Sequence, residues 1–437
     1  MTLIYNATIV DKNKSVKGSI LIDGKKIKSV LTKKETDEFL FESDLNIDLI
    51  DAKGMVVLPS FIDMHSHFRD PGFTQKEDLE SGINSAIAGG YGAVVLMPNT
   101  NPVVSSLELA EKNHQKAKSM GKCRVFQSVS ITNDFKGESV EHISNLDSKK
   151  VPLITEDGKE VESAAVMLKG MKLAAEKKII VSCHCEDPKL AAQARELRAE
   201  SLKSLSQGNK KDAEKFLQEA NSLLELAEDT MTVRNIQIAK KAGCRVHICH
   251  VSTTGSIEAV RQAKKLGLNV TAEITPHHFS LIGQKAPGIF NIVNPPLRTE
   301  DDRQSLLKAI KDGTCDVIAT DHAPHTVQDK LNGAPGFPGL ETSFAAGYTN
   351  LVKTKVINLK KLSALMSANP ADILGLKNVG LIEPGYFANL TIVDLNKTWK
   401  VKGEDFASRG KITAFEGKTL NGQVVKTIYE GQIVYSL

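Results

Sequence analysis

Short apolar runs alternate with amphipathic stretches through most of the chain. Each run is rich in Val, Ile and Leu, and most are followed by a segment with apolar residues at helical spacing. This alternation is typical of βα units, in which a helix joins two parallel strands. Eight runs occur in the middle of the chain: Val57–His65, Gly92–Met97, Arg124–Ile131, Val151–Thr155, Ile179–His184, Arg245–His250, Asn269–Thr275 and Asp316–Thr320. Eight units predict an α/β fold of the closed (β/α)8 barrel type, with an active site at the carboxyl ends of the strands.

The segments between the runs predict the outer helices of this barrel. An open, doubly wound sheet is the alternative, but no glycine-rich phosphate loop follows the first run, which argues against it. Clear helical patterns cover Asp78–Ala88, Ser106–Met120, Glu162–Lys177, Ser256–Leu266 and Asp301–Asp312.

Residues 186–240 form an unusually long connection between the fifth and sixth runs. They are rich in Ala, Leu, Glu, Lys and Gln and contain almost no Gly or Pro. This composition predicts two or three helices over or beside the barrel mouth. We interpret them as solvated decoration rather than as a specific binding element.

The two ends of the chain have a different pattern, which predicts strands without intervening helices. Near the N-terminus two apolar runs flank Asp23-Gly24, a strong hairpin signal, and near the C-terminus two runs flank Glu430-Gly431. Neither end has enough strands to bury a core alone, so we expect both ends to form one small domain. The expected division is 1–57 and 381–437 for the small domain and 58–380 for the barrel.

Composition narrows the class of protein without changing this architecture. The chain is 41% hydrophobic and 25% charged, as is ordinary for a globular protein. A net charge of +4, from 56 basic and 52 acidic residues, is too balanced for a nucleic-acid-binding surface. No apolar run approaches a membrane span, and the first residues do not resemble a signal peptide, so we expect a cytoplasmic protein.

The six cysteines are scattered and include no C-x-x-C pair. Free, buried thiols in a reducing compartment are the expected state. Cys183 and Cys185 flank His184, but alternation along a strand would direct them away from it, so we do not expect them to bind metal.

Nine of the eleven histidines lie at or just after a predicted strand of the barrel. Random placement would not concentrate them there, which favours a metal site over structural histidines. They are His65, His67, His184, His247, His250, His277, His278, His322 and His325.

Five side chains at the strand ends form the candidate metal site. His65 and His67 are two residues apart on the first strand, so their imidazoles point to the same face. His184 and His250 end the fifth and sixth strands, and Asp321 ends the eighth. Such donors from four strands can hold one or two divalent ions of the zinc type.

A metal at this position serves hydrolysis. It polarises a carbonyl and lowers the pKa of a bound water to about 7. Asp321 can bind metal and also move the proton of the attacking water to a leaving nitrogen. A bridging anion from the fourth strand would complete a pair of ions, and Thr155-Glu-Asp-Gly158 offers two carboxylates there.

Over nearly the whole chain, these motifs resemble the amidohydrolase superfamily and, within it, the dihydroorotases of the type I kind. The resemblance implies a (β/α)8 TIM-like barrel with a β-sandwich built from both chain ends. The segments that carry it are Pro59–Gly72, Met97–Pro102, His184–Asp187, His250–Thr253, Thr275–His278, Asn294–Arg298, Ala319–His325 and Gly339–Thr342.

The resemblance also implies roles for individual residues. Asp157 is the implied metal bridge, in place of the carbamylated lysine of many relatives, and its neighbour Glu156 would point away. Asp321 is the implied catalytic aspartate and also a metal ligand. The other implied ligands are His65 and His67 for one ion and His184 and His250 for the second, and the implied substrate contacts are Arg69, Asn99, Asn294, His325, Pro335 and Gly336.

The activity implied is the reversible conversion of dihydroorotate to N-carbamoyl-aspartate in pyrimidine biosynthesis, with one or two Zn²⁺ ions. Arg69 and Asn99 suit a substrate carboxylate, which simple hydantoins lack. The alternatives are a hydantoinase or dihydropyrimidinase on the same scaffold and a non-catalytic homologue that serves as a scaffold. A small-molecule substrate, a homodimer and association with an aspartate transcarbamoylase complete the expectation, with no nucleic acid or membrane as partner.

Overall fold

In the computed structural model, which describes residues 1–42, 47–283 and 288–437, both chain ends enter one β-sheet. Its strand order is β17-β16-β15-β5-β1-β2-β3, with β4 paired to β1. The N-terminal and C-terminal parts join where β5 pairs antiparallel with β15, with Val57 opposite Ile392. The strands are β1 (Thr2–Val10), β2 (Ser15–Asp23), β3 (Lys26–Leu31), β4 (Asp48–Asp51), β5 (Val56–Pro59), β15 (Leu390–Lys400), β16 (Thr419–Tyr429) and β17 (Gln432–Ser436).

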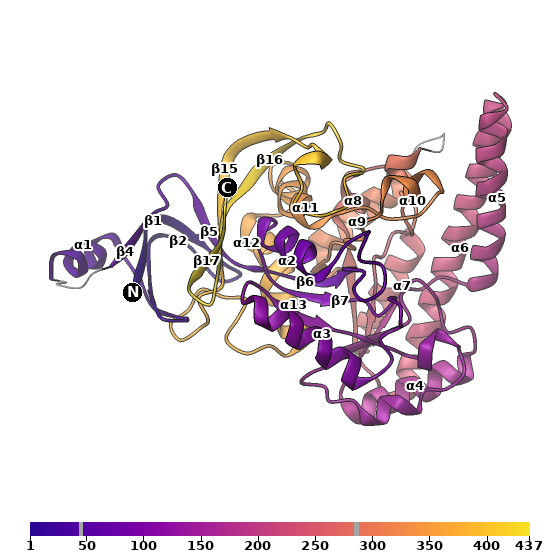
Figure 1. Ribbon diagram of the computed structural model, residues 1–437, viewed down its shortest axis with the longest axis horizontal. Helices are drawn as coiled ribbons and strands as arrows, with labels where there is room; N and C mark the ends of the chain where they lie inside the picture. The colour runs from indigo at the N-terminus through magenta and orange to yellow at the C-terminus, as the bar shows by residue number, and fades with distance from the viewer. Residues whose placement is uncertain (43–46, 284–287) are drawn as a thin grey trace.

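This sheet curls so that its edge strand β3 meets the segment that precedes β15. The backbone N–H of Ile27 donates to Tyr386 O at 2.9 Å, which ties β3 to the segment before β15. The space inside is filled by apolar side chains from both chain ends, so the small domain has a core that neither end makes alone. In Figure 1 it lies to one side of the barrel, with the N-terminal strands outermost. Its core includes Ile4, Ile9, Ile20, Ile22, Val57, Leu390, Ile392 and Ile428.

A ring of parallel strands forms the barrel. β8 and β9 are one run interrupted at Ser128, whose N–H donates to Leu96 O at 3.0 Å. The ring closes where the His67 N–H donates to His322 O at 2.8 Å, beside the parallel bridge between Ser66 and His322. In order around the ring, the strands are β6 (Phe61–Ser66), β7 (Tyr91–Leu96), β8 (Arg124–Gln127) with β9 (Val129–Ser130), β10 (Leu153–Thr155), β11 (Ile180–Cys183), β12 (Val246–Ile248), β13 (Val270–Ile274) and β14 (Val317–Ile318).

Amphipathic helices surround the ring. Each predicted helix has a matching helix whose ends follow capping rules: Asp78 accepts from the Ser81 N–H at the start of α2, and Gly121 ends α3 in the left-handed conformation. The helices are α2 (Leu79–Ala88), α3 (Leu107–Met120), α4 (Ala164–Lys177), α7 (Thr254–Lys265), α8 (Pro276–Ser280), α9 (Glu300–Asp312), α11 (Leu340–Gly347), α12 (Leu359–Ser363) and α13 (Asn369–Leu374). The predicted fold class is therefore confirmed.

The first apolar run does not form one strand. It divides at Ser60 into β5, which belongs to the small domain, and β6, the first barrel strand. Both parts are fully buried and therefore apolar, so the sequence shows one continuous apolar run. The pattern gives no sign that the chain passes from one sheet to another at Ser60.

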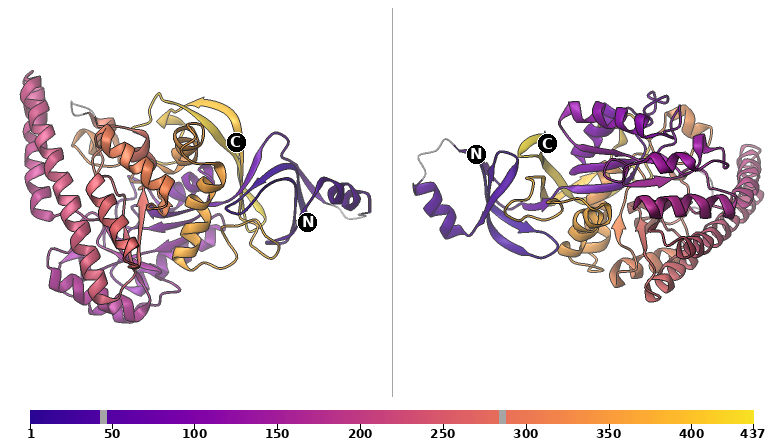
Figure 2. Two further views of the ribbon diagram at one scale, coloured as in Figure 1. Left: turned by 180° about the vertical axis from the view of Figure 1, so that it is seen from behind. Right: turned by 90° about the horizontal axis from the view of Figure 1, so that it is seen from below.

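The long connection after β11 forms a helical hairpin. It consists of α5 (Pro188–Ser206) and α6 (Lys210–Ala242), and Figures 1 and 2 show it along the end of the barrel farthest from the small domain. Asp187 caps α5 by accepting from the N–H groups of Lys189 and Leu190. Ala191, Ala194, Ala220 and Leu224 pack the two helices together.

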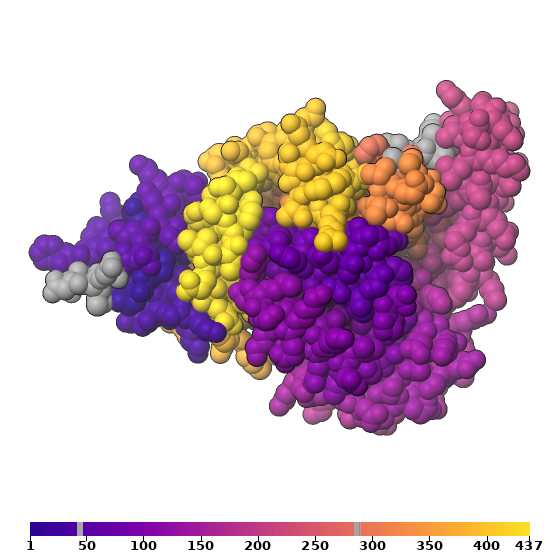
Figure 3. Space-filling model, in the orientation of Figure 1, coloured from indigo at the N-terminus to yellow at the C-terminus, as the bar shows by residue number. Residues whose placement is uncertain are grey.

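Two further α-helices lie outside the ring and the hairpin. α1 (Lys33–Glu42) lies on the small domain, and α10 (Val327–Leu331) lies beside the barrel mouth. The space-filling view shows the yellow C-terminal segment between the indigo N-terminal strands and the barrel (Figure 3). No helix in the described ranges is both long and apolar enough to cross a membrane.

Candidate metal centre

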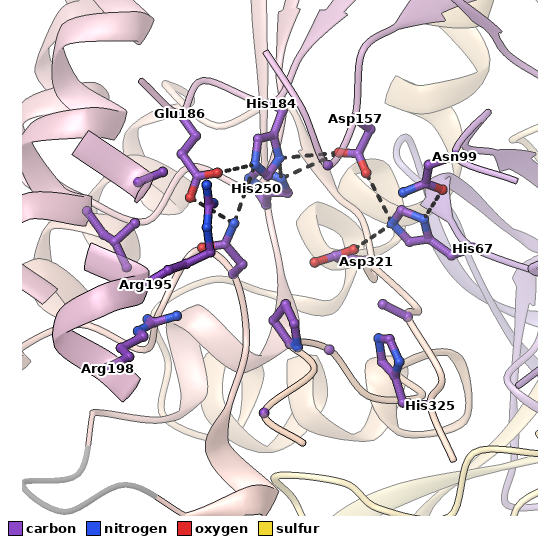
Figure 4. Close-up of a pocket in the computed structure, with 18 of the residues that line it drawn as sticks. His67, Asn99, Asp157, His184, Glu186, Arg195, Arg198, His250, Asp321 and His325 are labelled. Atoms are coloured by element: carbon purple, nitrogen blue, oxygen red, sulfur yellow. Dashed lines mark hydrogen bonds and ion pairs between the residues drawn. The ribbon is translucent and has the colours of Figure 1, made fainter. Parts of the chain in front are cut away.

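A cavity of about 490 Å³ opens at the carboxyl ends of the barrel strands. It is the position at which barrel enzymes place their active sites. Figure 4 shows the side chains that converge there. The predicted residues that line it are His67, Arg69, Asn99, Asp157, His184, His250, Asn294, Asp321, His325, Pro335 and Gly336.

His65 in β6 and His67 just after it meet two carboxylates, Asp157 from across the barrel and Asp321 from the loop after the neighbouring strand β14. His65 Nε2 lies 3.3 Å from Asp157 Oδ1, and His67 Nε2 lies 3.4 Å from Asp157 Oδ2. Asp321 Oδ1 is 3.1 Å from His67 Nε2 and 3.6 Å from His65 Nε2. His65 does not line the cavity, but its contacts with Asp157 and Asp321 place it in the same cluster. These two partners lie 92 and 256 positions away in the chain.

The histidines that end β11 and β12 complete the cluster from the other side of Asp157. His184 Nδ1 lies 2.9 Å from His250 Nε2, and the same atom lies 3.4 Å from Asp157 Oδ1. Asp157 therefore stands between the two pairs of histidines, and Figure 4 shows it between His67 on one side and His184 and His250 on the other. Its neighbour Glu156 turns away and accepts hydrogen bonds from the backbone N–H and hydroxyl of Thr132.

The donor set fits a divalent metal. His65 Nε2 and Asp157 Oδ1 are buried and have no hydrogen-bond partner among the described residues, although they face each other. Imidazole nitrogens and carboxylate oxygens are the ligands that zinc-type ions prefer. Within 4.8 Å of one another lie ligand atoms of His65, His67 and Asp321, and likewise of His65, Asp157 and His250.

Glu273, which the sequence analysis did not select, orients the cluster from behind. Its carboxylate lies 2.7 Å from His65 Nδ1 and 2.9 Å from His247 Nε2, and it accepts from the His250 backbone N–H at 3.1 Å. A carboxylate on Nδ1 leaves the Nε2 lone pair of His65 directed at the cluster. Asn99 does the same for His67, because its Oδ1 lies 2.9 Å from His67 Nδ1.

Asp321 is held in place by its own loop. The next residue, His322, is fully buried and lies 3.2 Å from Glu77 Oε2 through Nε2, while its Nδ1 accepts from the Gly339 N–H. Asp321 itself has a φ of 47°, and His250 and Arg69 also have positive φ values, of 29° and 58°. Strained backbone of this kind persists where the surrounding structure fixes a functional geometry.

The electrostatics of the site keep its carboxylates ionised. Burial raises the pKa of Asp321, but the adjacent His67 and His65 outweigh burial and hold that pKa well below its usual range. The pKa of Asp157 is likewise lowered, because His65, His184 and His250 oppose the effect of its burial. Asp321 is therefore available as a proton acceptor at neutral pH.

Arg69 and His325 form a second side of the cavity, on which Arg69 carries the positive charge. Arg69 Nη2 lies 3.3 Å from His325 Nε2, and Arg69 Nε is buried without a hydrogen-bond partner in the described structure. Burial and the neighbouring guanidinium lower the pKa of His325 to about 3, so His325 is neutral at pH 7. A guanidinium with unused donors suits a planar carboxylate.

Helix α5 contributes residues that the sequence analysis did not assign to the site. Arg195 and Arg198 line the cavity from the side opposite His67 and Asn99 (Figure 4). Their position corrects the interpretation of residues 186–240 as decoration, because α5 forms one wall of the cavity. The positive charge of these arginines did not indicate a place in the cavity, because solvent-exposed helices also carry arginines.

Asn294 also lies on this side of the site. Its Nδ2 donates to Glu186 Oε1 at 2.9 Å, and Glu186 in turn lies 3.4 Å from His184 Nε2. Glu186 follows His184 by two residues, so the strand-end signal could have found it. His277 and His278, which were left out of the predicted site, do not line this cavity in the described structure.

Comparisons with known proteins agree with this geometry. The model of the amidohydrolase family matches residues 56–434. The chain is 38% identical over 434 residues to a dihydroorotase of Clostridium botulinum, with 99% of each chain covered. It is 37% identical over 445 residues to a dihydroorotase of Staphylococcus epidermidis, covering 100% of this chain and 99% of the relative.

Solved structures share the fold at lower sequence identity. An L-hydantoinase from Arthrobacter aurescens aligns with a TM-score of 0.86 and 22% identity, covering 100% of this chain and 96% of the other. A dihydropyrimidinase from Brevibacillus agri aligns with a TM-score of 0.82 and 20% identity, covering 100% and 95%. At these identities the likeness concerns the fold alone.

Proposed function

The chain belongs to the amidohydrolase family, and from this premise we propose that it is a dihydroorotase. It hydrolyses the cyclic amide of dihydroorotate to N-carbamoyl-aspartate and catalyses the reverse ring closure, which serves pyrimidine biosynthesis. The observation that carries the assignment is that one cavity brings the histidine and aspartate cluster together with the Arg69 guanidinium, whose Nε has no hydrogen-bond partner among the described residues. The substrate offers a hydrolysable ring amide to the first and a carboxylate to the second.

We propose zinc as the ion, because imidazole and carboxylate ligands suit it. The ligands would be His65 and His67 on one side, His184 and His250 on the other, and Asp157 between them, with Asp321 beside the first pair. When bound, such an ion acts as a Lewis acid on the carbonyl and lowers the pKa of water. Whether the cluster holds one or two ions is tested by metal analysis of the purified protein.

The chain's own residues orient the substrate and move the proton. Arg69, with Asn99 and His325, would hold the substrate carboxylate, since each offers a donor on that side of the cavity. Asp321 would accept the proton of the attacking water and deliver it to the ring nitrogen as the C–N bond breaks. In the reverse direction the same carboxylate would take the proton from the carbamoyl nitrogen.

Three further residues would form the wall around the substrate ring. Asn294, Pro335 and Gly336 line the cavity above the cluster. Gly336 has a φ of 114°, and a Cβ there would lie 2.6 Å from the Ala323 Cβ, so only glycine fits. These residues would cover the ring and limit the entry of water.

The decisive experiment compares dihydroorotate with dihydrouracil, which has no carboxylate, and measures zinc content in parallel. Turnover of dihydroorotate by the zinc-loaded protein, far above that of dihydrouracil, is the expected result. Preference for dihydrouracil would instead indicate a dihydropyrimidinase-like enzyme. A protein that binds no zinc and turns over neither substrate would be a scaffold.

Removing Asp321 tests its proposed role in proton transfer. Asp321→Ala is expected to lower kcat by at least a thousandfold, because the acceptor of the water proton is lost. Far-ultraviolet circular dichroism should stay unchanged, which separates this effect from unfolding. An Asp321→Ala protein with more than a tenth of the wild-type kcat would contradict the mechanism.

The cellular setting is proposed from the same family relationship. We expect a cytoplasmic homodimer that associates with an aspartate transcarbamoylase, whose product would be the substrate for ring closure. Light scattering of the purified protein, alone and with that enzyme, measures both associations.

A further inference from the structure

Lys330 is a buried lysine beside the cavity whose charge has no acidic partner. Its side chain is 1% exposed, and among the described residues no carboxylate lies within 4.0 Å of its ammonium. The acid of the same helix, Asp329, pairs instead with Lys76 at 3.2 Å. An unpaired buried charge is costly, so its presence requires compensating contacts.

Three backbone carbonyls supply those contacts. Lys330 Nζ donates to Ile292 O at 2.8 Å, to Ala334 O at 3.0 Å and to Gly336 O at 2.8 Å. An ammonium has three donors and no acceptor, so these bonds use its whole capacity. An apolar side chain of equal length would fill the space but leave three buried carbonyls without this donor.

The carbonyls belong to the two segments that form the wall of the cavity opposite the barrel floor. Residues 289–297 contain Asn294, and residues 332–336 contain Pro335 and Gly336, all of which line the cavity. The segments also meet directly, because the Gly336 N–H donates to Ile292 O at 2.9 Å. Ile292 O thus accepts from both Lys330 and Gly336.

We propose that Lys330 is a positioning residue that fastens these two segments together and so fixes the wall that closes over the substrate ring. The proposal rests on the proposed dihydroorotase function and deepens it. Lys330 touches neither the metal cluster nor Asp321, so it acts on substrate binding through the backbone that it holds. A rigid wall binds the ring without first having to be ordered, which improves affinity.

The test replaces Lys330 with methionine, which has a similar length and no donor. Lys330→Met is expected to raise the KM for dihydroorotate about tenfold while kcat changes less than threefold and zinc content stays constant. Lys330→Arg, which keeps charge and donors, should give a KM between those of Lys330→Met and the wild type. Lys308→Met, at an exposed position of α9, is the matched control and should leave KM unchanged.

Hydrogen exchange provides a second readout that does not depend on turnover. In Lys330→Met, peptides covering 289–297 and 332–336 should exchange at least tenfold faster than in the wild type, while peptides of α5 and α6 keep their rates. If the variant does not fold, Lys330→Gln, which retains two donors, should show the same changes at about a third of the size.

The results separate this inference from the proposed function. Unchanged KM together with unchanged exchange of both segments would overturn the role of Lys330. A loss of kcat at constant KM would also overturn it, because it would place Lys330 in the chemistry. If the wild type does not hydrolyse dihydroorotate, the function fails, and the exchange experiment still decides whether Lys330 holds the wall.

Discussion

At the scale of the residue, the site depends on groups that orient the ligands as well as on the ligands. Glu273 is the clearest case, because one buried carboxylate contacts His65, His247 and the backbone of His250. The histidines at strand ends could be found from the sequence, since a barrel brings all carboxyl ends of its strands to one face. The distances between these histidines could not be predicted from the sequence, because they depend on the irregular register of β6 between Asp63 and Ser66.

Glu273→Gln tests this orientation. The amide offers only one acceptor where the carboxylate offers two, so His65 or His247 loses its partner. We expect zinc affinity to fall tenfold to a hundredfold, as is typical for carboxylates behind metal-binding histidines. Titration with a chelator that competes for zinc measures the change.

Glu341→Gln is the matched control for that experiment. Glu341 accepts from the backbone N–H groups of Ala407 and Ser408, away from the histidine cluster. It should retain wild-type zinc affinity. Equal losses in both variants would show that the effect is general destabilisation rather than ligand orientation.

A carboxylate in a strand such as Val270–Ile274 was itself a signal that the sequence analysis could have used. Glu273 interrupts a run whose neighbours are buried, and a buried carboxylate requires partners. Arg195 and Arg198 gave no comparable signal. Their place in the cavity follows from how the α5–α6 hairpin packs on the barrel, which local sequence does not specify.

At the scale of the element, that hairpin supplies positive charge to the entrance of the cavity. The arginine pair on α5 faces an anionic substrate, and long-range attraction of this kind raises association rates. The double variant Arg195→Gln/Arg198→Gln is expected to lower kcat/KM about threefold to tenfold at low ionic strength. The difference from wild type should vanish at about 0.5 M salt, where screening acts within a few ångströms.

The control is the double variant Lys210→Gln/Lys211→Gln, which also removes two positive charges, but from an exposed part of α6 near the tip of the hairpin. It should leave kcat/KM and its salt dependence at wild-type values. A salt-independent loss in the α5 variant would argue for direct contact with the substrate rather than for attraction at a distance.

Helix α6 is fastened to the barrel by a buried ion pair. Glu228 accepts from the Ser252 N–H at 2.8 Å and pairs with Arg298 Nη2 at 3.1 Å. Burial raises the pKa of Glu228, but Arg298 and the Ser252 contacts outweigh burial and leave this pKa below its usual range. The pair therefore contributes its full stabilisation above about pH 4.3, which is the pKa of a glutamate in the unfolded chain. This contribution is lost as the pH falls through the lower pKa of Glu228 in the folded protein.

Glu228→Gln should lower the free energy of unfolding by about 3 kcal/mol at pH 7, since Arg298 is left buried without its counter-charge. The difference in unfolding free energy between variant and wild type should narrow on acidification below about pH 4, because the wild type then loses its own carboxylate charge. Urea denaturation at several pH values measures it. Glu219→Gln, at another exposed site of α6, should match the wild type at each pH.

At the scale of the whole molecule, the small domain is a joint product of both chain ends. Alternating apolar positions and two turn signals were enough to predict that the ends combine. The exchange of sheets at Ser60 was not predicted, because β5 and β6 are both buried throughout. We propose that residues 1–57 and 381–437 form the small domain and residues 58–380 the barrel. The passage from one sheet to the other at Ser60 lies close to the first of these boundaries.

The two hairpin turns provide a test of this joint assembly. A Cβ on Gly431 would lie 2.1 Å from Gly24 O, whereas a Cβ on Gly24 would meet nothing within 4 Å. Both residues have positive φ, of 80° and 56°. Gly24→Ala should therefore lower the free energy of unfolding by about 1 kcal/mol, from backbone strain alone, and Gly431→Ala by about 3 kcal/mol. Equal losses in urea denaturation would show that the turns do not meet.

The closure of the barrel between β6 and the loop after β14 has a consequence for how the protein matures. The hydrogen bond from His67 to His322 joins the first ring strand to the last, and the candidate ligands His65 and Asp321 lie on the two sides of that seam. During synthesis His67 emerges 254 residues before Asp321, the partner that lies across this seam. Tight retention of metal should therefore begin only when the ring has shut, which makes the ion a reporter of completed folding.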